Sequence, residues 1–380
     1  MDGVIEQLGR EAPGLRRSLL AWWERHGRHD IPWKAGPDGR PPAPGEPLPP
    51  YPVLVAEVML QQTRLEVVLP YWHRWMGRFP SLSRLAAASE QEVLHLWQGL
   101  GYYARGRRLH QAARLLQAEE EGIWPRSVEG WQALPGIGRS TAGSILSSAF
   151  DLPASILDGN AVRVLARLLA HPDPPGRSSR LFWGLSETLL DRERPRIFNQ
   201  ALMDLGATVC RPRRPACGGC PWAQRCAAYA AGDPHRWPVR EQARPVPFHV
   251  IGVGIVLDEE RRVLIDQRPA EGLLGGLWEF PGGKQEPDEP IADTITRELR
   301  EELAIEVEVG EELIRLEHAY SHRRLLFVVH LCRRLAGEPR PLASQQLRWV
   351  AVDDLGDYPF PAANARIIAA LRERLGARAA

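Results

Sequence analysis

One stretch of about three dozen residues, Leu134–Arg167, constrains this chain more than any other. It opens with Leu-Pro-Gly-Ile-Gly (134–138), a tight turn that leads into a helical pattern over Ser140–Ala149. Two glycines let the backbone turn sharply and present N–H groups at the start of the following helix, where a phosphate can bind. Taken alone, a glycine-rich connection between two helices is usually only a turn.

The second feature of this stretch is Asp158-Gly159-Asn160, placed where another amphipathic helix begins. An aspartate in front of a helix is usually an N-cap. The same carboxylate can also take part in catalysis, and the sequence of this segment alone does not decide between the two interpretations. The spacing of the turn and the aspartate, followed downstream by a cysteine cluster, favours the functional one.

Length and charge divide the chain into two parts. With 380 residues and 44% hydrophobic content, it can bury two ordinary cores. Residues 1–230 contain 28 Lys and Arg against 22 Asp and Glu, whereas residues 231–380 contain 20 against 25. The basic part is therefore the better candidate for a polyanion partner, and the acidic part for a metal site.

Four of the five cysteines crowd into residues 210–226, as Cys210, Cys217, Cys220 and Cys226. This crowding indicates a metal site in a reducing compartment rather than a disulfide framework. Four thiolates can close one tetrahedral or one cubane site. Zinc is the second choice, because zinc ribbons generally bring two CxxC pairs from distant segments and this loop holds a single one.

The N-terminus carries charges throughout, without the apolar core of a signal peptide, and no run reaches transmembrane length. We therefore expect a cytoplasmic protein, associated with the nucleoid if it is bacterial, with no membrane partner.

A buried acid is expected in the helical pattern that begins at Tyr51, after a helix over 4–26 and an irregular Pro/Gly-rich loop over 35–50. Val53–Leu60 is apolar on every face except at Glu57. A helix that is apolar all round is buried, so Glu57 is a carboxyl in a poor solvent. Burial would raise its pKa and keep a proton available near neutral pH. The alternative is an ordinary exposed glutamate.

Residues 92–117 predict two helices that are broken at Gly99–Gly101. The break is followed by two aromatic and three basic residues, Tyr102, Tyr103, Arg105, Arg107 and Arg108. Aromatic side chains beside arginines fit stacking on bases and pairing with phosphates. Core tyrosines beside a solvated basic face fit equally well.

The C-terminal part changes character after a Pro- and Arg-rich linker over 229–246. Strands are expected at Phe248–Leu257, Arg262–Gln267, Glu306–Gly310 and Leu325–Cys332. The acidic segment among them matches a Nudix box, G-x5-E-x7-R-E-U-x-E-E-x-G-U, at Gly283, Glu289, Arg297, Glu298, Glu301 and Glu302.

Ala304 replaces the closing glycine of this box, where a left-handed residue would be strained. Glu298, Glu301 and Glu302 share one helix face, as oxygen ligands of Mg²⁺ would need. A solvated helix face is the alternative. The box is a strong signal of fold and a weaker one of hydrolase activity.

At this point the chain resembles one family closely. Its N-terminal part looks like the helix-hairpin-helix DNA glycosylases that carry a 4Fe–4S cluster. The pairing with a Nudix-like C-terminal domain is similar specifically to the adenine DNA glycosylases (MutY type). The most specific matching segments are residues 56–63, 99–110, 134–143, 157–160, the four-cysteine loop and residues 272–283.

The resemblance covers nearly the whole chain apart from loop 35–50, and it implies a multidomain fold. An all-α helix-hairpin-helix glycosylase domain over 1–228, with its iron–sulfur loop at 210–226, precedes the linker and an α+β Nudix-like lesion-recognition domain over 247–380. The implied function is base-excision repair of double-stranded DNA, with removal of adenine mispaired with 8-oxoguanine or guanine. We expect a monomer with a 4Fe–4S cluster, for which Mg²⁺ at the glutamates is possible but not required.

The resemblance also assigns the catalytic residues. It makes Glu57 the general acid and Asp158 the carboxylate that stabilises the sugar cation, with Asn160 in support. Ser140 stands where lyase relatives carry the lysine that forms a Schiff base. Lys34 is the only amine-bearing side chain in the glycosylase part, so water is the expected final nucleophile.

The DNA contacts implied by the resemblance fall into three groups. The hairpin glycines Gly136 and Gly138 contact a phosphate. Gln62 and Tyr102 form a wedge in the duplex. The side of the oxidised base is contacted by Gly276, Tyr320, Ser321 and His322.

The chemistry explains these residue types without the family name. Cleavage of a purine N-glycosidic bond leaves positive charge on the sugar and negative charge on the base. An acid must protonate the base and a carboxylate must offset the sugar charge, while the base must leave the duplex to reach them. Three alternatives stay open: a bifunctional glycosylase/lyase for oxidised pyrimidines, a DNA-tethered nucleotide-pool pyrophosphatase, and a non-catalytic DNA-binding protein.

Overall fold

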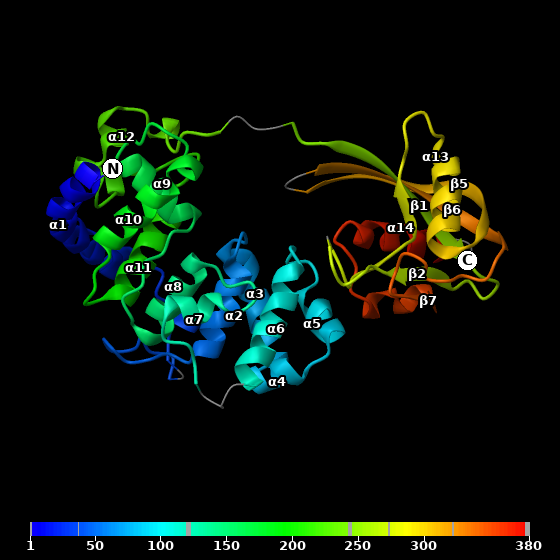
Figure 1. Cartoon of the computed structure of the whole chain (residues 1–380), viewed down its shortest axis with the longest axis horizontal. Coiled ribbons are helices and arrows are strands. Elements are labelled where there is room, and N and C mark those ends of the chain that lie inside the picture. Colours follow the sequence, from blue (N-terminus) through cyan, green and yellow to red (C-terminus); the bar gives the residue numbers. More distant parts are fainter. Residues whose placement is uncertain are drawn as a thin grey trace. The chain divides into compact units, whose positions relative to one another are not determined.

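The computed structural model describes residues 2–36, 38–118, 123–241, 245–272, 274–320 and 323–376 (Figure 1). Its internal contacts divide the chain into two compact units. The first unit combines Met1–Ala86 with Gln111–Ala243, and the second combines Ala87–His110 with Arg244–Ala380. The internal segment Ala87–His110 thus belongs with the C-terminal part. The domain bounds 1–228 and 247–380 stay a prediction.

The first unit is helical, as the sequence predicts. Its helices are α1 (Asp2–His26), α2 (Pro50–Leu60), α3 (Leu65–Arg78), α4 (Leu82–Ala87), α7 (Val128–Gln132), α8 (Arg139–Phe150), α9 (Gly159–Leu168), α10 (Ser179–Leu189), α11 (Pro195–Asp204) and α12 (Ala227–Ala230). Single turns at η1 (Pro32–Lys34), η2 (Pro175–Ser178), η3 (Leu205–Val209), η4 (Cys217–Gly219), η5 (Ala223–Arg225) and η6 (Pro234–Arg236) connect them. Over the described ranges, no helix is both long and apolar enough to cross a membrane.

One core of the first unit lies where α1 packs against α10 and α11, and residues of α9 belong to the same core. Leu8, Ala12, Leu15 and Leu19 recur at helical spacing along α1, so all four face this core. Trp222 from the cysteine loop fills the same core, and its indole N–H donates to the carbonyl of Leu15 at 2.9 Å. The cysteine loop is therefore anchored on this core.

A second packed region places the hairpin next to the acid-bearing helix. Helix α2 is buried along nearly its whole length and packs against α3 and α8, which confirms the prediction from its continuous apolar pattern. Turn 134–138 connects α7 to α8, and Leu134 and Ile137 hold it by burying their side chains. Gly136 and Gly138 are left exposed at its tip.

The second unit is an α+β fold around a mixed sheet. The described strands are β1 (Phe248–Leu257), β2 (Val263–Gln267), β3 (Trp278–Glu279), β4 (Gly282–Lys284), β5 (Glu306–Tyr320), β6 (Arg323–Ala336) and β7 (Gln346–Val350). They run in the order β3-β2-β1-β6-β5, with β4 paired to β1 and β7 to β2. Strands β1 and β6 pair in parallel, and the other pairings are antiparallel.

Helices cover both faces of this sheet (Figure 1). Val263 and Ile265 point to the side of α14 (Asn364–Gly376), where Ile367 joins the same core. Leu264, between them, points to the side of α13 (Ile291–Leu303), where it meets the core that contains Ile295. Successive strand residues face opposite sides, so this one segment serves both layers. Turn η7 (Val352–Asp357) and helices α5 (Glu90–Trp97) and α6 (Ala104–Ala118) complete the fold, and α6 is shared between the units.

The β5–β6 hairpin is longer than the sequence predicts. The apolar pattern indicates Glu306–Gly310 and Leu325–Cys332, whereas the strands extend to Tyr320 and Ala336. Cross-strand pairs such as Arg324–Glu317 at 2.9 Å lie beyond the apolar stretches and continue the ladder with exposed charges. A hydrophobic pattern alone cannot predict strand ends that consist of exposed, charged residues.

Candidate active site

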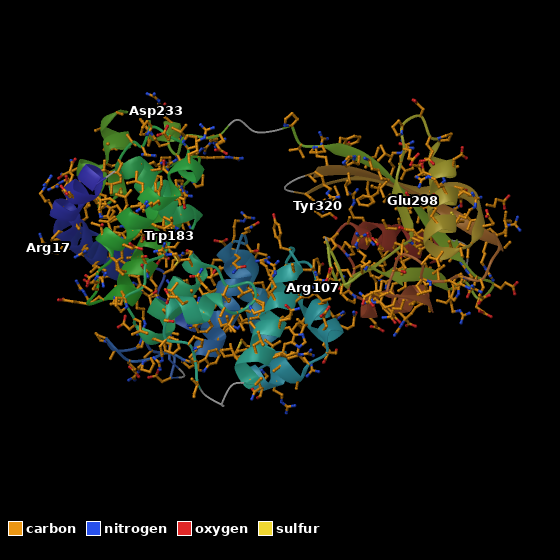
Figure 2. The ribbon with its side chains drawn as sticks, viewed as in Figure 1. Arg17, Arg107, Trp183, Asp233, Glu298 and Tyr320 are labelled. Atoms are coloured by element: carbon orange, nitrogen blue, oxygen red, sulfur yellow. The ribbon has the colours of Figure 1, made fainter. Side chains whose placement is uncertain are left out.

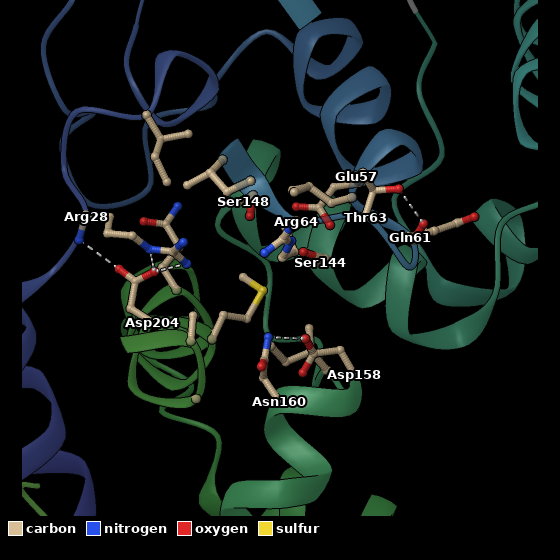
Figure 3. Close-up of a pocket in the computed structure, with 18 of the residues that line it drawn as sticks. Arg28, Glu57, Gln61, Thr63, Arg64, Ser144, Ser148, Asp158, Asn160 and Asp204 are labelled. Atoms are coloured by element: carbon tan, nitrogen blue, oxygen red, sulfur yellow. Dashed lines mark hydrogen bonds and ion pairs between the residues drawn. The ribbon is translucent and has the colours of Figure 1, made fainter. Parts of the chain in front are cut away.

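A cavity of about 440 Å³ in the first unit is lined by α2, α8, the start of α9 and η1 (Figure 3). This volume lies in the range of about 300–1,000 Å³ that is typical of small-molecule sites. The cavity brings together five residues that the sequence singles out: Lys34, Glu57, Ser140, Asp158 and Asn160. Among the other side chains that line it are Arg28, Arg64, Ser144, Ser148, Arg163, Gln200 and Asp204.

Glu57 is the acid of this cavity. Its helix neighbours Ala56 and Val58 are buried, and its own side chain is half-buried because it faces the cavity. Burial raises the pKa of Glu57 to about 7. The nearby Ser144 hydroxyl lowers this pKa, the Asp158 carboxylate raises it further, and Lys34 lowers it. The side chain therefore holds a proton close to neutral pH, as its apolar sequence context predicts.

Asp158 is the second carboxyl in the cavity, and it is also the N-cap of α9. One oxygen accepts the backbone N–H of Ala161 at 2.7 Å, and the other accepts the side-chain amide of Asn160 at 3.1 Å. Both oxygens of this carboxyl therefore accept hydrogen bonds from groups at the start of α9. The capping and functional interpretations of Asp158 thus describe the same geometry.

The hairpin is tied to this cavity by two polar side chains. The Ser140 hydroxyl accepts the backbone N–H of Leu157, next to Asp158, at 3.0 Å. Gln61 donates its amide to the Gly136 carbonyl at 3.1 Å and to the Thr141 hydroxyl at 3.2 Å. These bonds fix the distance from the hairpin to the carboxyls. Sequence reasoning assigned no role to Gln61.

The tip of the hairpin presents backbone N–H groups at the start of α8. Gly136 has a φ of 81°, which favours glycine, and Gly138 is the N-cap of α8 in extended conformation. A side chain at Gly138 would meet no atom within 4 Å, and within the described ranges no side chain caps this end of α8. Open space beside uncapped N–H groups is the setting in which a helix end binds phosphate.

A buried ion-pair group forms another wall of the cavity. Asp204 accepts from the Arg28 guanidinium at 2.7 Å, the Arg28 backbone N–H at 2.9 Å and the Trp23 indole at 2.9 Å. Lys34 lies 3.5 Å from the same carboxylate and donates to the Arg28 carbonyl at 3.1 Å. Burial alone would raise the pKa of Asp204, but Lys34 and Arg28 hold it below its ordinary value.

Sequence reasoning missed Arg28 and Asp204 because they lie far apart in the chain. It had singled out Lys34 only as an amine to be checked for lyase chemistry. Burial lowers the pKa of Lys34, although Asp204 acts against this.

The two wedge candidates share an unusual backbone. Gln62 and Tyr102 have φ values of 57° and 48°, in the left-handed region that residues other than glycine rarely adopt. Both side chains are exposed. Strained, exposed residues of this kind cluster at functional sites, and the sequence carries no signal for the strain.

The other members of the Tyr102–Arg108 cluster divide between the core and the surface. Tyr103 is buried and its hydroxyl donates to the Phe360 carbonyl at 3.1 Å within the second unit, so the core interpretation holds for it. Arg105 is buried and donates to the carbonyls of Leu100 and Gly101. Arg107 (Figure 2) donates to the Ala270 carbonyl at 2.6 Å. Of the three basic residues, Arg108 is the exposed one.

The four predicted metal ligands surround one small cavity, which Arg167 also lines. Arg167 is almost fully buried and donates to the Cys210 thiol at 3.3 Å and to the Arg211 and Pro212 carbonyls at 2.8 and 3.0 Å. Burial raises the pKa of the Cys220 thiol to about 12. Thiols held so close together in poor solvent would lose their protons only to a metal.

A chain of hydrogen bonds joins this loop to the catalytic cavity. The Asn160 side-chain oxygen accepts from Arg163 at 2.7 Å, and the same guanidinium donates to the carbonyls of Gly206 at 2.7 Å and Cys210 at 2.8 Å. Asn160 in turn donates to Asp158. The sequence offered one signal for Arg163 and Arg167, which are spaced by one helical turn on the helix that Asp158 caps.

One arginine pairs with three of the Nudix-box glutamates. Arg297 donates to Glu289 at 2.8 Å, to Glu298 (labelled in Figure 2) at 3.0 Å and to Glu301 at 3.3 Å. Burial raises the pKa of Glu302 to about 7, and Glu298 adds to the effect. In the part of the chain that the structure describes, no three His, Cys, Asp or Glu side chains are arranged to hold a single metal ion.

The candidates for lesion recognition lie in the second unit. Gly276 is buried with a φ of 72°, and its carbonyl accepts from Gln91 of α5 at 3.3 Å and from Gln267 at 2.9 Å. Tyr320 ends β5 and is half-buried (Figure 2). Ser321 and His322 lie outside the described residues. The structure thus gives Gly276 a packing role, and the contact of this group with a base stays a prediction.

Comparison with known proteins identifies the family. The model of the HhH-GPD superfamily of base excision DNA repair proteins matches residues 55–187, and the NUDIX domain model matches residues 252–370. The adenine DNA glycosylases of Mus musculus and Homo sapiens are 35% and 34% identical to this chain, over 90% of it and over 75% and 71% of their own lengths. The chain belongs to the adenine DNA glycosylase family. A solved thermostable thymine-DNA glycosylase is similar with a TM-score of 0.50 and 25% identity, covering 58% of this chain and 98% of its own.

Membership confirms the fold and the reaction class that the sequence predicts. The protein is a DNA N-glycosylase of base-excision repair, of MutY type. It combines an all-α helix-hairpin-helix part with a Nudix-like α+β part. DNA is its substrate. The interpretation as a non-catalytic DNA-binding protein is excluded.

Proposed function

We propose that this glycosylase releases adenine mispaired with 8-oxoguanine or guanine in double-stranded DNA, acts as a monomer, and uses Glu57 as general acid and Asp158 as stabiliser of the sugar cation. One observation carries the proposal: two carboxyls in opposite environments face a single cavity. Burial keeps a proton on Glu57, and N–H donors stabilise the charge on Asp158. Opposed environments of this kind assign the acid and the anion in glycoside hydrolysis.

The reaction follows from these two states. The adenine leaves the duplex and enters the cavity, where Glu57 donates its proton to a ring nitrogen. The bond between sugar and base then breaks, and its electron pair stays with the base. The sugar cation is stabilised by the Asp158 carboxylate, which Asn160 and the N–H of Ala161 hold in place. Water adds to the sugar cation and passes a proton to the Glu57 carboxylate, which restores the acid and completes the hydrolysis.

We expect no lyase step. Ser140 accepts a backbone hydrogen bond where a lyase would carry its amine, and the Lys34 amine is engaged with Asp204 and the Arg28 carbonyl. The product is therefore an intact strand with an abasic site. Efficient borohydride trapping of a covalent complex, abolished by Lys34→Ala, would show instead that Lys34 attacks the sugar.

DNA is bound by backbone N–H groups of the hairpin and by side chains that insert into the duplex as a wedge. The uncapped start of α8, with Gly136 and Gly138 at the hairpin tip, suits a phosphate, which positions the strand without reading its sequence. Gln62 and Tyr102 fill the space that the flipped base leaves. Tyr320, Ser321 and His322 read the partner base. Replacing Ser321 and His322 together by Ala should narrow the discrimination between 8-oxoguanine·adenine and guanine·adenine duplexes.

The cysteine loop fits a 4Fe–4S cluster. Cys210, Cys217, Cys220 and Cys226 would hold it, and the buried Arg167 would offset the negative charge of four thiolates. When bound, the cluster supplies a structural crosslink within the loop. The single CxxC pair in this compact loop favours a cubane over zinc, because zinc ribbons generally bring two such pairs from distant segments. Brown protein with about four irons per chain is expected; colourless anaerobic protein with stoichiometric zinc would contradict the cluster.

Mg²⁺ at the Nudix box is not required for this function. Arg297 occupies three of the glutamates, and Ala304 ends α13 in left-handed conformation. Incubating the full chain with Mg²⁺ and oxidised or normal nucleoside triphosphates should yield no monophosphate. Turnover that disappears in Glu301→Gln would overturn the view of this part as a reader of DNA.

Substrate choice is tested with three duplexes that hold adenine opposite 8-oxoguanine, guanine or thymine. We expect adenine release from the first two and intact adenine·thymine pairs, scored as strand breaks after alkali. Equal release from all three would contradict the proposed specificity.

A further inference from the structure

Ser144 is a buried hydroxyl without a hydrogen-bond partner. It is 4% exposed, lies in the middle of α8 and lines the catalytic cavity, and its Oγ makes no hydrogen bond within the described structure. Serines inside helices usually bond back to a carbonyl one turn earlier. Ser147 on the same helix does so, because its hydroxyl donates to the Gly143 carbonyl at 2.9 Å. Ser144 is therefore an exception within its own helix.

This hydroxyl faces the Glu57 carboxyl and favours its ionised form, although the two groups do not meet hydrogen-bond geometry in the described structure (Figure 3). The charged groups that act on Glu57 are Asp158, from the N-cap of α9, and Lys34, from η1. The remaining charged residues that line the cavity come from the segment after α2, from α3, α9, α11 and the segment after α1: Arg64, Glu66, Arg163, Asp204 and Arg28. Ser144 differs from all of these because it offers a neutral donor.

We propose that Ser144 is a positioning residue of the reaction, whose hydroxyl donates a hydrogen bond to the carboxylate that Glu57 becomes when it has given its proton to the base. This inference rests on the proposed function, in which Glu57 is the acid. In that step the O–H bond of Glu57 breaks, the proton joins a ring nitrogen of adenine, and the electron pair of the glycosidic bond goes to the base. A buried carboxylate is left behind, and Ser144 is the neutral donor beside it.

The idle hydroxyl before the reaction is consistent with this role. Hydrogen bonds to ionised acceptors are stronger than those between neutral groups. A donor that engages only after proton transfer therefore favours the state in which the base is protonated. It also limits how far burial can raise the pKa of Glu57, the direction in which Ser144 acts here.

The test is the pH dependence of single-turnover adenine release from an 8-oxoguanine·adenine duplex. In Ser144→Ala we expect the alkaline limb of the rate profile to move about one unit to higher pH, because the carboxylate has lost a donor. We expect no fall in Tm, because the hydroxyl that is removed has no partner.

Ser147→Ala is the matched control on the same helix. Its hydroxyl is fully buried, donates to Gly143 and accepts from Asn199 at 2.9 Å, so this substitution should lower Tm and leave the limb in place. The two variants thus separate a structural serine from a positioning one.

Two results would overturn the inference. A Ser144→Ala limb that coincides with that of the unsubstituted protein would remove the positioning role, and so would a uniform loss of rate with no movement of the limb. Glu57→Gln, measured beside them, distinguishes the two proposals. If it is inactive while the Ser144→Ala limb stays in place, the proposed function stands and this inference fails; if it retains full activity, the proposed function itself fails.

Discussion

Glu57 in the catalytic cavity and Glu289 in the Nudix box are carboxyls in opposite states. Glu57 faces a cavity, and the effect of burial outweighs those of the Ser144 hydroxyl and Lys34, so its pKa rises to about 7. Glu289 accepts from Arg297, the Thr294 hydroxyl and the Glu286 backbone N–H, and these bonds lower its pKa to about 2. One carboxyl can exchange a proton near neutral pH, and the other cannot.

The difference shows that the number of glutamates does not locate the chemistry. The Nudix box contains four glutamates on α13 or just before it, yet Arg297 donates hydrogen bonds to three of them. The cavity offers a single acid whose helix carries no other charge, and an aspartate held by amides. Buried carboxyls without a close cation are costly and are kept where they act.

The largest effect is expected from Asp158→Asn. Asparagine caps a helix as well as aspartate does, so α9 should stay intact, but the charge that offsets the sugar cation is lost. We expect single-turnover adenine release to fall by about 10³-fold or more, with DNA binding preserved. The matched control is Glu301→Gln in the Nudix box, where excision should not change. A Glu301→Gln effect of similar size would erase the distinction between the two regions.

The next effect concerns stability and has opposite signs in the two regions. The pKa of Glu57 is higher in the folded protein than in the unfolded chain, so folding binds a proton and stability falls as pH rises from about 4.5 through about 7. Glu57→Gln removes this loss of stability at high pH. It should stabilise the protein by about 1–3 kcal/mol at pH 8, with little difference below pH 4.5.

Glu289→Gln should do the reverse. Its folded pKa is depressed, so its contribution is present above about pH 4.5 and is lost as pH falls toward about 2. The variant should be less stable than the unsubstituted protein at pH 8 and indistinguishable from it near pH 2. Urea unfolding of both variants at three pH values checks the signs. The same sign for both would mean that the surroundings of these carboxyls do not control their energetics.

The smallest effect is expected at the end of the Nudix helix. Ala304 has a φ of 58° and a ψ of 33°, a conformation that glycine adopts without strain. Ala304→Gly should therefore raise the stability of the second unit by about 1 kcal/mol. Adenine release should stay the same. A loss of stability would mean that the methyl group contributes more by packing than the backbone loses by strain.

Local patterns made much of this fold predictable. The helix expected over 4–26 is α1 (Asp2–His26), and the strand expected at Phe248–Leu257 is β1 to the residue. Glu57 could be predicted as buried because its helix is apolar on every other face. In each case the signal is a period of hydrophobic residues within one segment.

Partners that lie far apart in the chain could not be predicted this way. Arg28 and Asp204 meet across 176 positions, and no local pattern joins them. Arg297 was assigned to the Nudix box, but that it satisfies the glutamates emerges only from the fold. Ser144 had a weak signal: with Ser140 and Ser148 it recurs every four residues, and all three line the cavity.

The central claim is that Glu57 gives its proton to the base. Single-turnover release of adenine from an 8-oxoguanine·adenine duplex, measured from pH 5 to 9, tests it most directly. We predict a rate that is constant below about pH 7 and falls tenfold per unit above it, together with a loss of about 10²–10⁴-fold and of this pH dependence in Glu57→Gln. A Glu57→Gln variant that keeps both the rate and its alkaline limb would contradict the account.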